Sequence, residues 1–366
     1  MHIALRPLLA IAAVLALVVP VTGAGAPAPS PLAHGAWFGD GDVTADAGFV
    51  PTTTSLPPGA YVTPNETSEM LDPNATIGPG ALLAISSSTE KVGSASVHVL
   101  NGCTANWVWK DQNGTLYLGT AGHCVLGNHT ATHGPGADTD AAGVTVYVCP
   151  NPCQVGGATG LAFATATASA SLAGTWFRLG KVAYARQPRA GADPADDFAL
   201  VAVPASLERL LGPRMPMWGG PDRVASIAPG DLLVMHGNGL GVGEVFPTKS
   251  RQGVFHGLTS TGNGFRATVW AAEGDSGSPV GLIASSGTPA GVGAAGILTA
   301  CLPTASDTDT CTQVARDVPT VAAPQQHLMT GPTLDHAIAL AQQANLCVRV
   351  VLAGEDPVSA PTATCP

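Results

Sequence analysis

Two short segments of this sequence carry residue types that could perform nucleophilic catalysis. Ser276 stands in the segment 273–279, Glu-Gly-Asp-Ser-Gly-Ser-Pro, where the flanking glycines allow a tight turn. In such a turn, backbone N–H groups can converge on a developing oxyanion. Well upstream, His123 stands in the segment 120–124, Thr-Ala-Gly-His-Cys, and is the type of base that removes the proton of a nucleophilic serine. Together, the two segments predict a serine nucleophile with a histidine base.

A third residue must hold the imidazole in the correct tautomer, and a carboxylate between the two segments fits this role. Asp196 and Asp197 precede the apolar run Phe-Ala-Leu-Val. We select Asp197 because it directly opens the run and can be half buried at the start of a strand. The resulting order of histidine, acid and serine excludes the order of the α/β-hydrolases, in which the serine comes first, and that of the subtilisins, in which the acid comes first.

These three segments resemble the motifs of the trypsin/chymotrypsin-like serine proteases, in particular the secreted bacterial members. The resemblance covers residues 77–350 and rests on Thr-Ala-Gly-His-Cys, Asp-Phe-Ala-Leu and Gly-Asp-Ser-Gly-Ser-Pro. It implies an all-β fold of two antiparallel six-stranded β-barrels, with the catalytic residues between them and a helix near the C-terminus.

The resemblance also implies a role for each residue of the motifs. His123 would be the general base, Asp197 its orienting partner and Ser276 the nucleophile, while the N–H groups of Gly274 and Ser276 would form the oxyanion hole. The family's activating N-terminal pattern is altered near residue 77. We therefore expect Asp275 to be held by other donors, as in the bacterial members, because a buried acid needs a partner.

Substrate preference is predicted from residues near the nucleophile. Relatives that cut after Lys or Arg carry an acid six residues before the serine, but this sequence has Trp270 there. Glu273 would disfavour acidic substrate side chains by like-charge repulsion. By resemblance, the strand that contains Thr299 and Ala300 would bind the substrate backbone. We expect a preference for uncharged, small or medium apolar side chains before the cut bond.

All eight cysteines follow the N-terminal apolar run, and an even number in an exported chain predicts disulfides. Neighbours in the sequence suggest four pairs: Cys103–Cys124, Cys149–Cys153, Cys301–Cys311 and Cys347–Cys365. The first pair also matches the family. The Cys-Pro-Asn-Pro-Cys loop of the second pair could instead bind a metal, but no cysteine or histidine pair stands nearby at zinc spacing, and the disulfide is favoured.

Charge and composition exclude some classes of binding partner. The formal net charge is −10, and no cluster of lysines or arginines is present. This argues against nucleic acid and against an anionic membrane surface. We expect protein or peptide substrates, no cofactor, no metal and a monomer.

The chain divides into segments of different character. Residues 8–19 form an apolar run that is too short for a membrane span and typical of a secretory signal, which predicts a secreted protein. The predicted segments are a signal peptide (1–26), a Pro/Gly/Ala-rich leader or pro-segment (27–76), an N-terminal barrel (77–212), a C-terminal barrel with its helix (213–350) and a disulfide-tethered tail (351–366).

Short β-prone runs separated by turn signals dominate the middle of the chain and favour a barrel or sandwich. The runs are 81–85, 95–100, 105–109, 115–119, 144–149, 198–203, 232–236, 253–256, 265–270 and 292–298. The sequence predicts one helix, over 334–344, capped by Thr333.

These observations lead to the hypothesis of a secreted serine endopeptidase that works through an acyl-enzyme. Two alternatives stay open at this stage. One is a catalytically silent binding protein on the same fold, although no residue of the triad is missing. The other is an exported serine esterase, against which the order of the motifs argues.

Overall fold

The computed structural model describes residues 76–92, 95–126, 144–150, 177–188, 193–238, 250–269, 271, 274–283, 291–301 and 327–365. The predicted signal peptide, and the leader up to residue 75, lie outside these residues. Within them, no helix is both long enough and apolar enough to cross a membrane.

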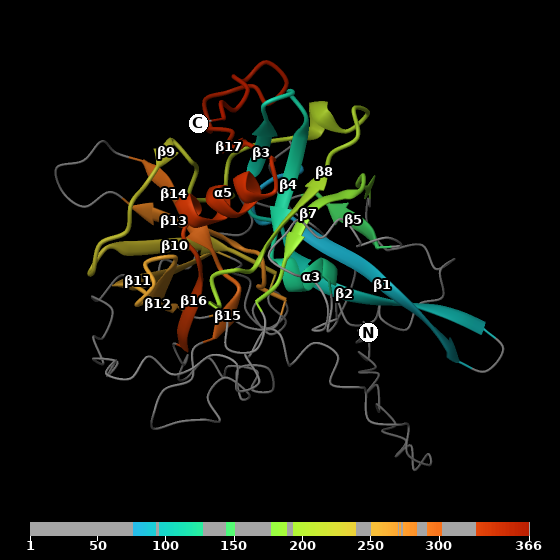
Figure 1. Cartoon of the computed structure of the whole chain (residues 1–366), viewed down its shortest axis with the longest axis horizontal. Helices are drawn as coiled ribbons and strands as arrows, with labels where there is room; N and C mark the ends of the chain where they lie inside the picture. The colour runs from blue at the N-terminus through green and yellow to red at the C-terminus, as the bar shows by residue number, and fades with distance from the viewer. Residues whose placement is uncertain are drawn as a thin grey trace, which may run out of the picture.

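Strands make up most of the described chain (Figure 1). The N-terminal half contains β1 (Leu82–Val92), β2 (Ala95–Thr104), β3 (Val108–Asp111), β4 (Leu116–Thr120), β5 (Thr145–Cys149), β6 (Phe177–Arg178), β7 (Val182–Arg186) and β8 (Phe198–Ala202). The C-terminal half contains β9 (Arg223–Val224), β10 (Leu232–His236), β11 (Ser250–Leu258), β12 (Gly264–Val269), β13 (Pro279–Ile283), β14 (Val292–Ile297), β15 (Ala300–Cys301), β16 (His327–Pro332) and β17 (Val348–Val350).

The strands of the N-terminal half form two antiparallel sheets. One has the order β2-β1-β5-β6, and its long β1–β2 hairpin projects away from the rest of the molecule (Figure 1). The other has the order β17-β3-β4-β8-β7. In this second sheet Thr120 pairs with Ala199, so the end of β4 and the start of β8 lie side by side. This pairing brings the histidine segment next to the acid segment.

The C-terminal half forms one sheet of eight strands in the order β15-β16-β12-β11-β10-β13-β14-β9. All its pairings are antiparallel except the short contact of β14 with β9. The serine segment leads directly into β13, which pairs with β10 and β14. The candidate nucleophile therefore lies just before a strand that is paired on both sides.

The predicted all-β class with a C-terminal helix is confirmed. The arrangement of the strands differs from two six-stranded barrels, because hydrogen bonding groups the described strands into sheets of four, five and eight without closing a ring. One reason is β17, which comes late in the chain and pairs with β3 of the N-terminal half. The predicted run 105–109 was also misplaced, since the strand begins at Val108.

Apolar packing joins the two halves. One buried cluster lies in the C-terminal half, and a second joins the N-terminal half to Val351 and Ala360 of the tail. A third contains residues from both halves, among them Trp107, Phe198, Val234 and Ile297. The indole N–H of Trp107 donates to the carbonyl of Gly296 at 3.2 Å and so adds a directed bond to this shared core. Burial of such large side chains fixes how the halves meet, and thus where their functional segments meet.

The C-terminal helix α5 (Leu334–Gln343) was predicted nearly to its observed bounds. Thr333 is its N-cap, and the Thr333 Oγ1 accepts a hydrogen bond from the amide of His336 at 3.3 Å. Its buried residues are Leu334, Ala337, Leu340 and Ala341, which form one face. Figure 1 shows α5 lying between the strands of the two halves.

Each of the four predicted disulfides involves at least one described cysteine. Cys103–Cys124 and Cys347–Cys365 are both formed. Cys149 is disulfide-bonded, but its predicted partner Cys153 lies outside the described residues. The predicted Cys301–Cys311 bond stays a prediction, because Cys311 also lies outside the described residues.

The tail after β17 is held by a buried lysine as well as by the second disulfide. Lys110 is 4% exposed, and its ammonium donates to the carbonyls of Pro357, Val358 and Ala360 at 3.1, 2.7 and 2.7 Å. Three carbonyl partners satisfy all three donors of an ammonium group.

Replacing Lys110 with methionine is expected to lower the free energy of unfolding by about 2–3 kcal/mol, because three carbonyls, two of them in buried hydrogen bonds, lose a charged donor. Urea denaturation measures this change. Lys181→Met is the matched control, since Lys181 is exposed, and it should change the free energy by less than about 0.5 kcal/mol. Equal stability of the two variants would contradict the role given to Lys110.

Candidate active site

His123 lies on a short helix, α3 (Gly122–Leu126), that the sequence analysis did not predict. The helix begins directly after β4 and packs against β7. Gly122 makes this close approach possible, because a Cβ atom there would lie 1.7 Å from the carbonyl oxygen of Arg186. His123 is 9% exposed, so its ring is largely enclosed but still reachable from solvent.

Asp197 holds His123 through both of its carboxylate oxygens. The Oδ2 atom lies 2.7 Å from the Nδ1 of His123, and Oδ1 accepts the backbone N–H of the same residue at 2.9 Å. Asp197 is 1% exposed and so is more deeply buried than the half-buried position that the sequence predicted. With Nδ1–H donating to the carboxylate, the other ring nitrogen, Nε2, carries the lone pair that can accept a proton.

An aromatic cluster supports the strand that begins at Asp197. The ring of Phe198, the next residue, lies 5.2 Å from that of Trp109 and 5.8 Å from that of Tyr184, centroid to centroid. Burial raises the pKa of Tyr184 well above its ordinary value, so its hydroxyl stays neutral. The rigid packing of Phe198 fixes the backbone position from which Asp197 reaches the imidazole.

The neighbouring acid, Asp196, has a different role from Asp197. Its Oδ2 lies 2.5 Å from Nη2 of Arg186, and its Oδ1 lies 2.8 Å from Nε2 of His336 on α5. Asp193, earlier in the same loop, accepts hydrogen bonds from two polar side chains of the turn 261–263. The loop that carries Asp197 is therefore tied to the helix and to a turn of the C-terminal half.

The turn that carries Ser276 is held through its carbonyl groups. Gly274 and Gly277 have φ angles of +97° and +91°, which favour glycine. The carbonyls of Gly274 and Ser276 accept hydrogen bonds from Thr104, and the carbonyl of Asp275 accepts the N–H of Ser278. Among the described residues, no acceptor is bonded to the N–H of Gly274 or of Ser276, although both residues are buried.

Unpaired backbone N–H groups in a buried turn are uncommon, because each costs free energy unless something accepts its hydrogen bond. These are the two N–H groups that the sequence analysis expected in the oxyanion hole. The arrangement suits a site in which a negatively charged oxygen is bound during the reaction.

Ser276 and His123 approach each other across the first disulfide. Cys124 Sγ lies 3.8 Å from the carbonyl oxygen of Ser276 and 3.9 Å from Nε2 of His123. The Nε2 atom and the serine turn therefore contact the same sulfur atom. In the part of the chain that the structure describes, no hydrogen bond joins Ser276 Oγ to His123 Nε2. Catalytic hydrogen bonds are often long in the absence of substrate and tighten in the complex.

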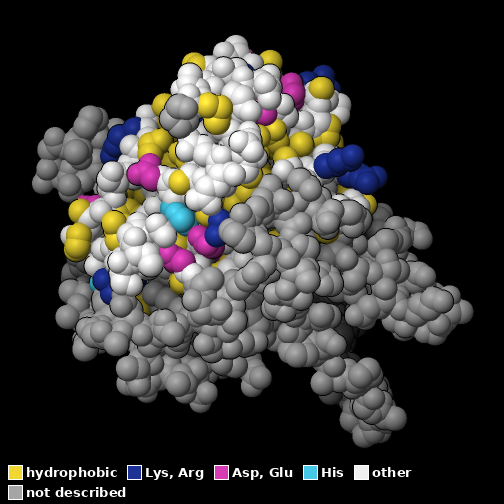
Figure 2. Space-filling view, in the orientation of Figure 1, with side chains coloured by type: hydrophobic (Ala, Val, Ile, Leu, Met, Phe, Trp, Pro, Cys, Tyr) yellow, Lys and Arg dark blue, Asp and Glu magenta, His cyan; other side chains and the backbone are white. Residues whose placement is uncertain are grey.

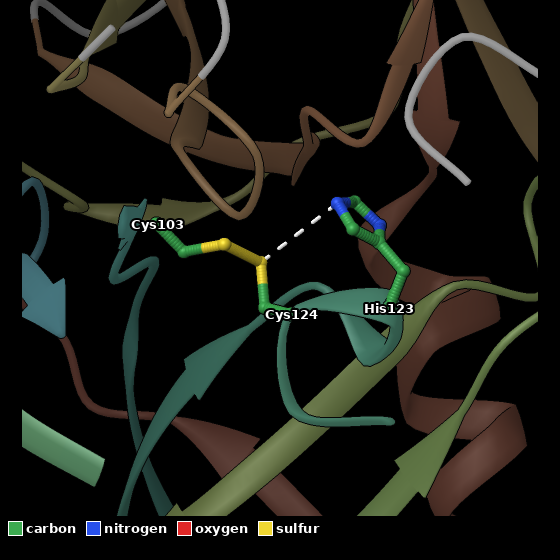
Figure 3. A group of neighbouring side chains, drawn as sticks. All are labelled: Cys103, His123 and Cys124. Atoms are coloured by element: carbon green, nitrogen blue, oxygen red, sulfur yellow. Dashed lines mark hydrogen bonds between the residues drawn. A yellow bond between two sulfur atoms is a disulfide. The ribbon is translucent and has the colours of Figure 1, made fainter. Parts of the chain in front are cut away.

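Figure 3 shows the imidazole of His123 beside the Cys103–Cys124 bond. The three side chains cluster as metal ligands could, with donor atoms within 4.8 Å of one another. Both sulfur atoms belong to the disulfide, however, and are not the thiolates that bind zinc. The cluster therefore fixes the position of the histidine and does not form a metal centre.

The acid before the nucleophile is paired with an arginine. Arg251, on β11, makes a two-bond ion pair with Asp275: Nη1 to Oδ2 at 2.5 Å and Nη2 to Oδ1 at 2.6 Å. Arg251 is 5% exposed and Asp275 is fully buried. Gly237 leaves room for the pair, since a Cβ there would lie 2.2 Å from Oδ1 of Asp275. The expectation that donors other than a new N-terminus hold Asp275 is met by this pair.

Replacing Arg251 with methionine is expected to lower the free energy of unfolding by about 3–5 kcal/mol, because it leaves the Asp275 carboxylate buried without its charge partner. The loss should also loosen the serine turn. Arg349→Met is the matched control: it breaks the partly exposed pair with Glu355 and should cost about 1 kcal/mol or less. Urea denaturation measures both, and similar losses in the two variants would contradict the prediction.

The predicted substrate-binding residues are placed only in part. Thr299 is buried, its N–H donates to the carbonyl of Thr330 at 3.0 Å, and its hydroxyl has no partner among the described residues. Ala300 lies in β15, a strand at one edge of the eight-stranded sheet, and pairs with Thr330 of β16. Trp270 and Glu273 lie outside the described residues.

The sequence analysis missed Thr104, Arg186, Arg251 and His336, which position the candidate catalytic segments. Arg186 and Arg251 lie 10 and 24 positions from their acid partners, but the sequence does not pair them. Thr104 and His336 contact the site from segments 170 and 140 positions away.

No protein-family model and no curated protein matches this chain. Comparison with solved structures finds Thermobifida fusca protease A, with 14% identity and a TM-score of 0.36 over 76% of this chain and 100% of that one. A Nocardiopsis protease matches with 14% identity and a TM-score of 0.35, over 75% of this chain and 99% of the other. The thermostable serine protease AL20, from an extremophilic microorganism, matches with 14% identity and a TM-score of 0.38, over 73% and 95%. The structures to which this chain is similar are named proteases, and the chemistry of the chain is inferred from the geometry of its own site.

Proposed function

We propose that this chain is a secreted serine endopeptidase that hydrolyses peptide bonds through an acyl-enzyme. Export is supported by the signal-like residues 1–26 and by the disulfides, which persist in oxidising compartments. Figure 2 shows charged side chains of both signs on the described part of one face, with acidic, basic and histidine side chains side by side near its centre.

In the proposed mechanism, Ser276 Oγ attacks the carbonyl carbon of the scissile bond while His123 Nε2 takes its proton. Asp197 stabilises the imidazolium that forms. The oxyanion accepts the N–H groups of Gly274 and Ser276. His123 then gives its proton to the leaving amine, and a water molecule, deprotonated by the same imidazole, hydrolyses the acyl-enzyme and restores Ser276.

One observation carries this proposal: an imidazole held at Nδ1 by a buried carboxylate stands beside a serine turn in which the N–H groups of Gly274 and Ser276 have no acceptor among the described residues. A structural histidine would explain the hydrogen bond to Asp197 but not two amides that lack an acceptor within the described chain. A binding protein has no need of either. The combination is what acyl transfer requires.

The substrate backbone is proposed to bind along β15. As the edge strand of its sheet, β15 pairs with β16 on one side only among the described residues. An extended peptide can add itself to such an edge through main-chain hydrogen bonds. Ala300 would then lie next to the residues that precede the cut bond, with the predicted preference for uncharged apolar side chains.

The test is to label the purified protein with a fluorophosphonate probe, map the modified residue, and measure turnover of matched peptide amides and esters. We expect a single adduct at Ser276 together with hydrolysis of peptide amides. Hydrolysis of esters alone would replace the proposal with the esterase, and the absence of any adduct at Ser276 would favour the catalytically silent binding protein.

A further inference from the structure

Thr104 connects the N-terminal half to the serine turn at the end of β2. It follows Cys103 directly and is completely buried. Its backbone N–H donates to the carbonyl of Ser276 at 2.8 Å, and its hydroxyl donates to the carbonyl of Gly274 at 2.9 Å. One residue thus holds the carbonyl groups on both sides of Asp275.

The direction of the hydroxyl proton follows from its two partners. Thr104 Oγ1 lies 3.0 Å from the backbone nitrogen of Asn238 and 2.9 Å from the carbonyl oxygen of Gly274. The amide can only donate and the carbonyl can only accept, so the hydroxyl proton belongs to the bond with Gly274. The residue cannot rotate to another partner without losing both bonds.

The turn is close-packed against Thr104 as well as bonded to it. A Cβ atom on Gly277 would lie 2.2 Å from the carbonyl oxygen of Thr104. That oxygen also accepts a hydrogen bond from Thr120 Oγ1 at 3.0 Å, and Thr120 stands three residues before His123. Thr104 is therefore fixed to the strand that leads to the candidate base.

The Gly274 carbonyl is the group in the turn whose orientation depends most on a hydrogen bond such as the one from Thr104. Glycine at φ +97° has no side chain to restrict its backbone, so its peptide groups can rotate at low cost. The Gly274 carbonyl belongs to the peptide unit that lies between the two units carrying the N–H groups of Gly274 and Ser276, so a change in its orientation would alter how these two N–H groups are placed relative to each other. A donor fixed in the other half of the molecule opposes that rotation.

We propose that Thr104 is a positioning residue for the oxyanion hole, acting through its side-chain hydroxyl on the Gly274 carbonyl. The inference rests on the proposed function and deepens it. Thr104 touches no reacting atom, and it acts by holding the two amides in place before the oxyanion forms. Preorganised donors of this kind act on the transition state more than on the bound substrate.

The experiment compares Thr104→Val, which keeps the shape but removes the hydroxyl, with Thr104→Ser, which keeps the hydroxyl. The substrates are peptide p-nitroanilides with an apolar residue before the cut bond. Thr104→Val should lower kcat by about 10–100-fold and change KM by less than about threefold, because donors displaced by a fraction of an ångström lose transition-state binding. Thr104→Ser should stay within about threefold of the wild-type kcat, because its hydroxyl can form the same bond.

Tyr117→Phe is the matched control. It also removes one buried hydroxyl bond, from Tyr117 to Asp111 Oδ2 at 2.8 Å, but near the start of β4, away from the end that leads to His123. It should leave kcat unchanged. A second readout is the affinity for a peptide boronate, which forms a tetrahedral adduct with the serine: affinity should fall in Thr104→Val while that for the product peptide does not. Should the valine variant not fold, Thr104→Ala, which relieves any crowding, is measured in its place.

Wild-type kcat in Thr104→Val, or an equal loss in Thr104→Ser, would overturn the role of the hydroxyl. Failure of the proposed function looks different: the wild-type protein itself would then show neither an adduct at Ser276 nor turnover.

Discussion

Ser276→Ala is expected to remove nearly all peptidase activity, lowering kcat by about 10⁵–10⁶-fold, because without Oγ no acyl-enzyme can form. The activity that remains should come from the amides of Gly274 and Ser276, which the substitution leaves in place. The fold should be unaffected, since the backbone bonds that hold the turn do not involve the serine side chain.

The matched control is Ser278→Ala, two residues further along the same turn. Ser278 is fully buried, and its hydroxyl has no partner among the described residues, so its removal breaks no bond there. Ser278→Ala should keep activity and its labelling by a fluorophosphonate, and Ser276→Ala should lose both. Retention of more than about 1% of the wild-type kcat by folded Ser276→Ala would place the nucleophile elsewhere.

The features that the sequence could predict are those decided by neighbouring residues. Glycines around Ser276 indicated a tight turn, and the structure places Gly274 and Gly277 at positive φ. An apolar run after Asp197 indicated a strand, which begins at Phe198. Thr333 indicated a helix start, because a cap bonds the amides of the next turn. Each signal lies within a few residues of the structure it predicts.

Features that depend on distant contacts could not be predicted in this way. Helix α3 is only five residues long, and the sequence lacks a cap for it. Its stability comes from the Cys103–Cys124 bond and from packing of Gly122 against Arg186. Similarly, β17 (Val348–Val350) was not among the predicted runs, and nothing in that segment reveals that its partner is β3.

The residues of the candidate site also fall into those that local sequence predicts and those that depend on distant contacts. Its reacting groups stand in recognisable local motifs, whereas the groups that position them come from other segments. Arg251 is separated from Asp275 by 24 positions, and Thr104 from Gly274 by 170. A buried acid can be expected to have a charged or hydrogen-bonding partner, but only the fold determines which residue is that partner.

Asp197→Asn is expected to lower kcat by about 10⁴-fold while leaving the protein folded, because it changes which nitrogen of His123 carries the proton. In the structure both oxygens of Asp197 accept from donors: Oδ1 from the backbone N–H of His123 and Oδ2 from Nδ1. An asparagine offers one oxygen and one NH₂ group. If its oxygen stays with the backbone N–H, its NH₂ group faces Nδ1 and stabilises the tautomer protonated at Nε2. That tautomer cannot accept the proton of Ser276.

The measurement pairs kcat with the nitrogen-15 chemical shifts of His123, which distinguish the two tautomers of a neutral imidazole. Asp196→Asn is the matched control, because Asp196 contacts Arg186 and His336 but not His123. It should keep the wild-type tautomer and lose less than about tenfold in kcat, as expected for a group that supports the acid loop without contacting the base. If Asp197→Asn changed the tautomer but kept more than about a tenth of the wild-type kcat, proton transfer to His123 would not limit the reaction. If Asp196→Asn caused the larger loss, the acid of the triad would have to be reassigned to Asp196, whose carboxylate would then have to turn from Arg186 toward the imidazole.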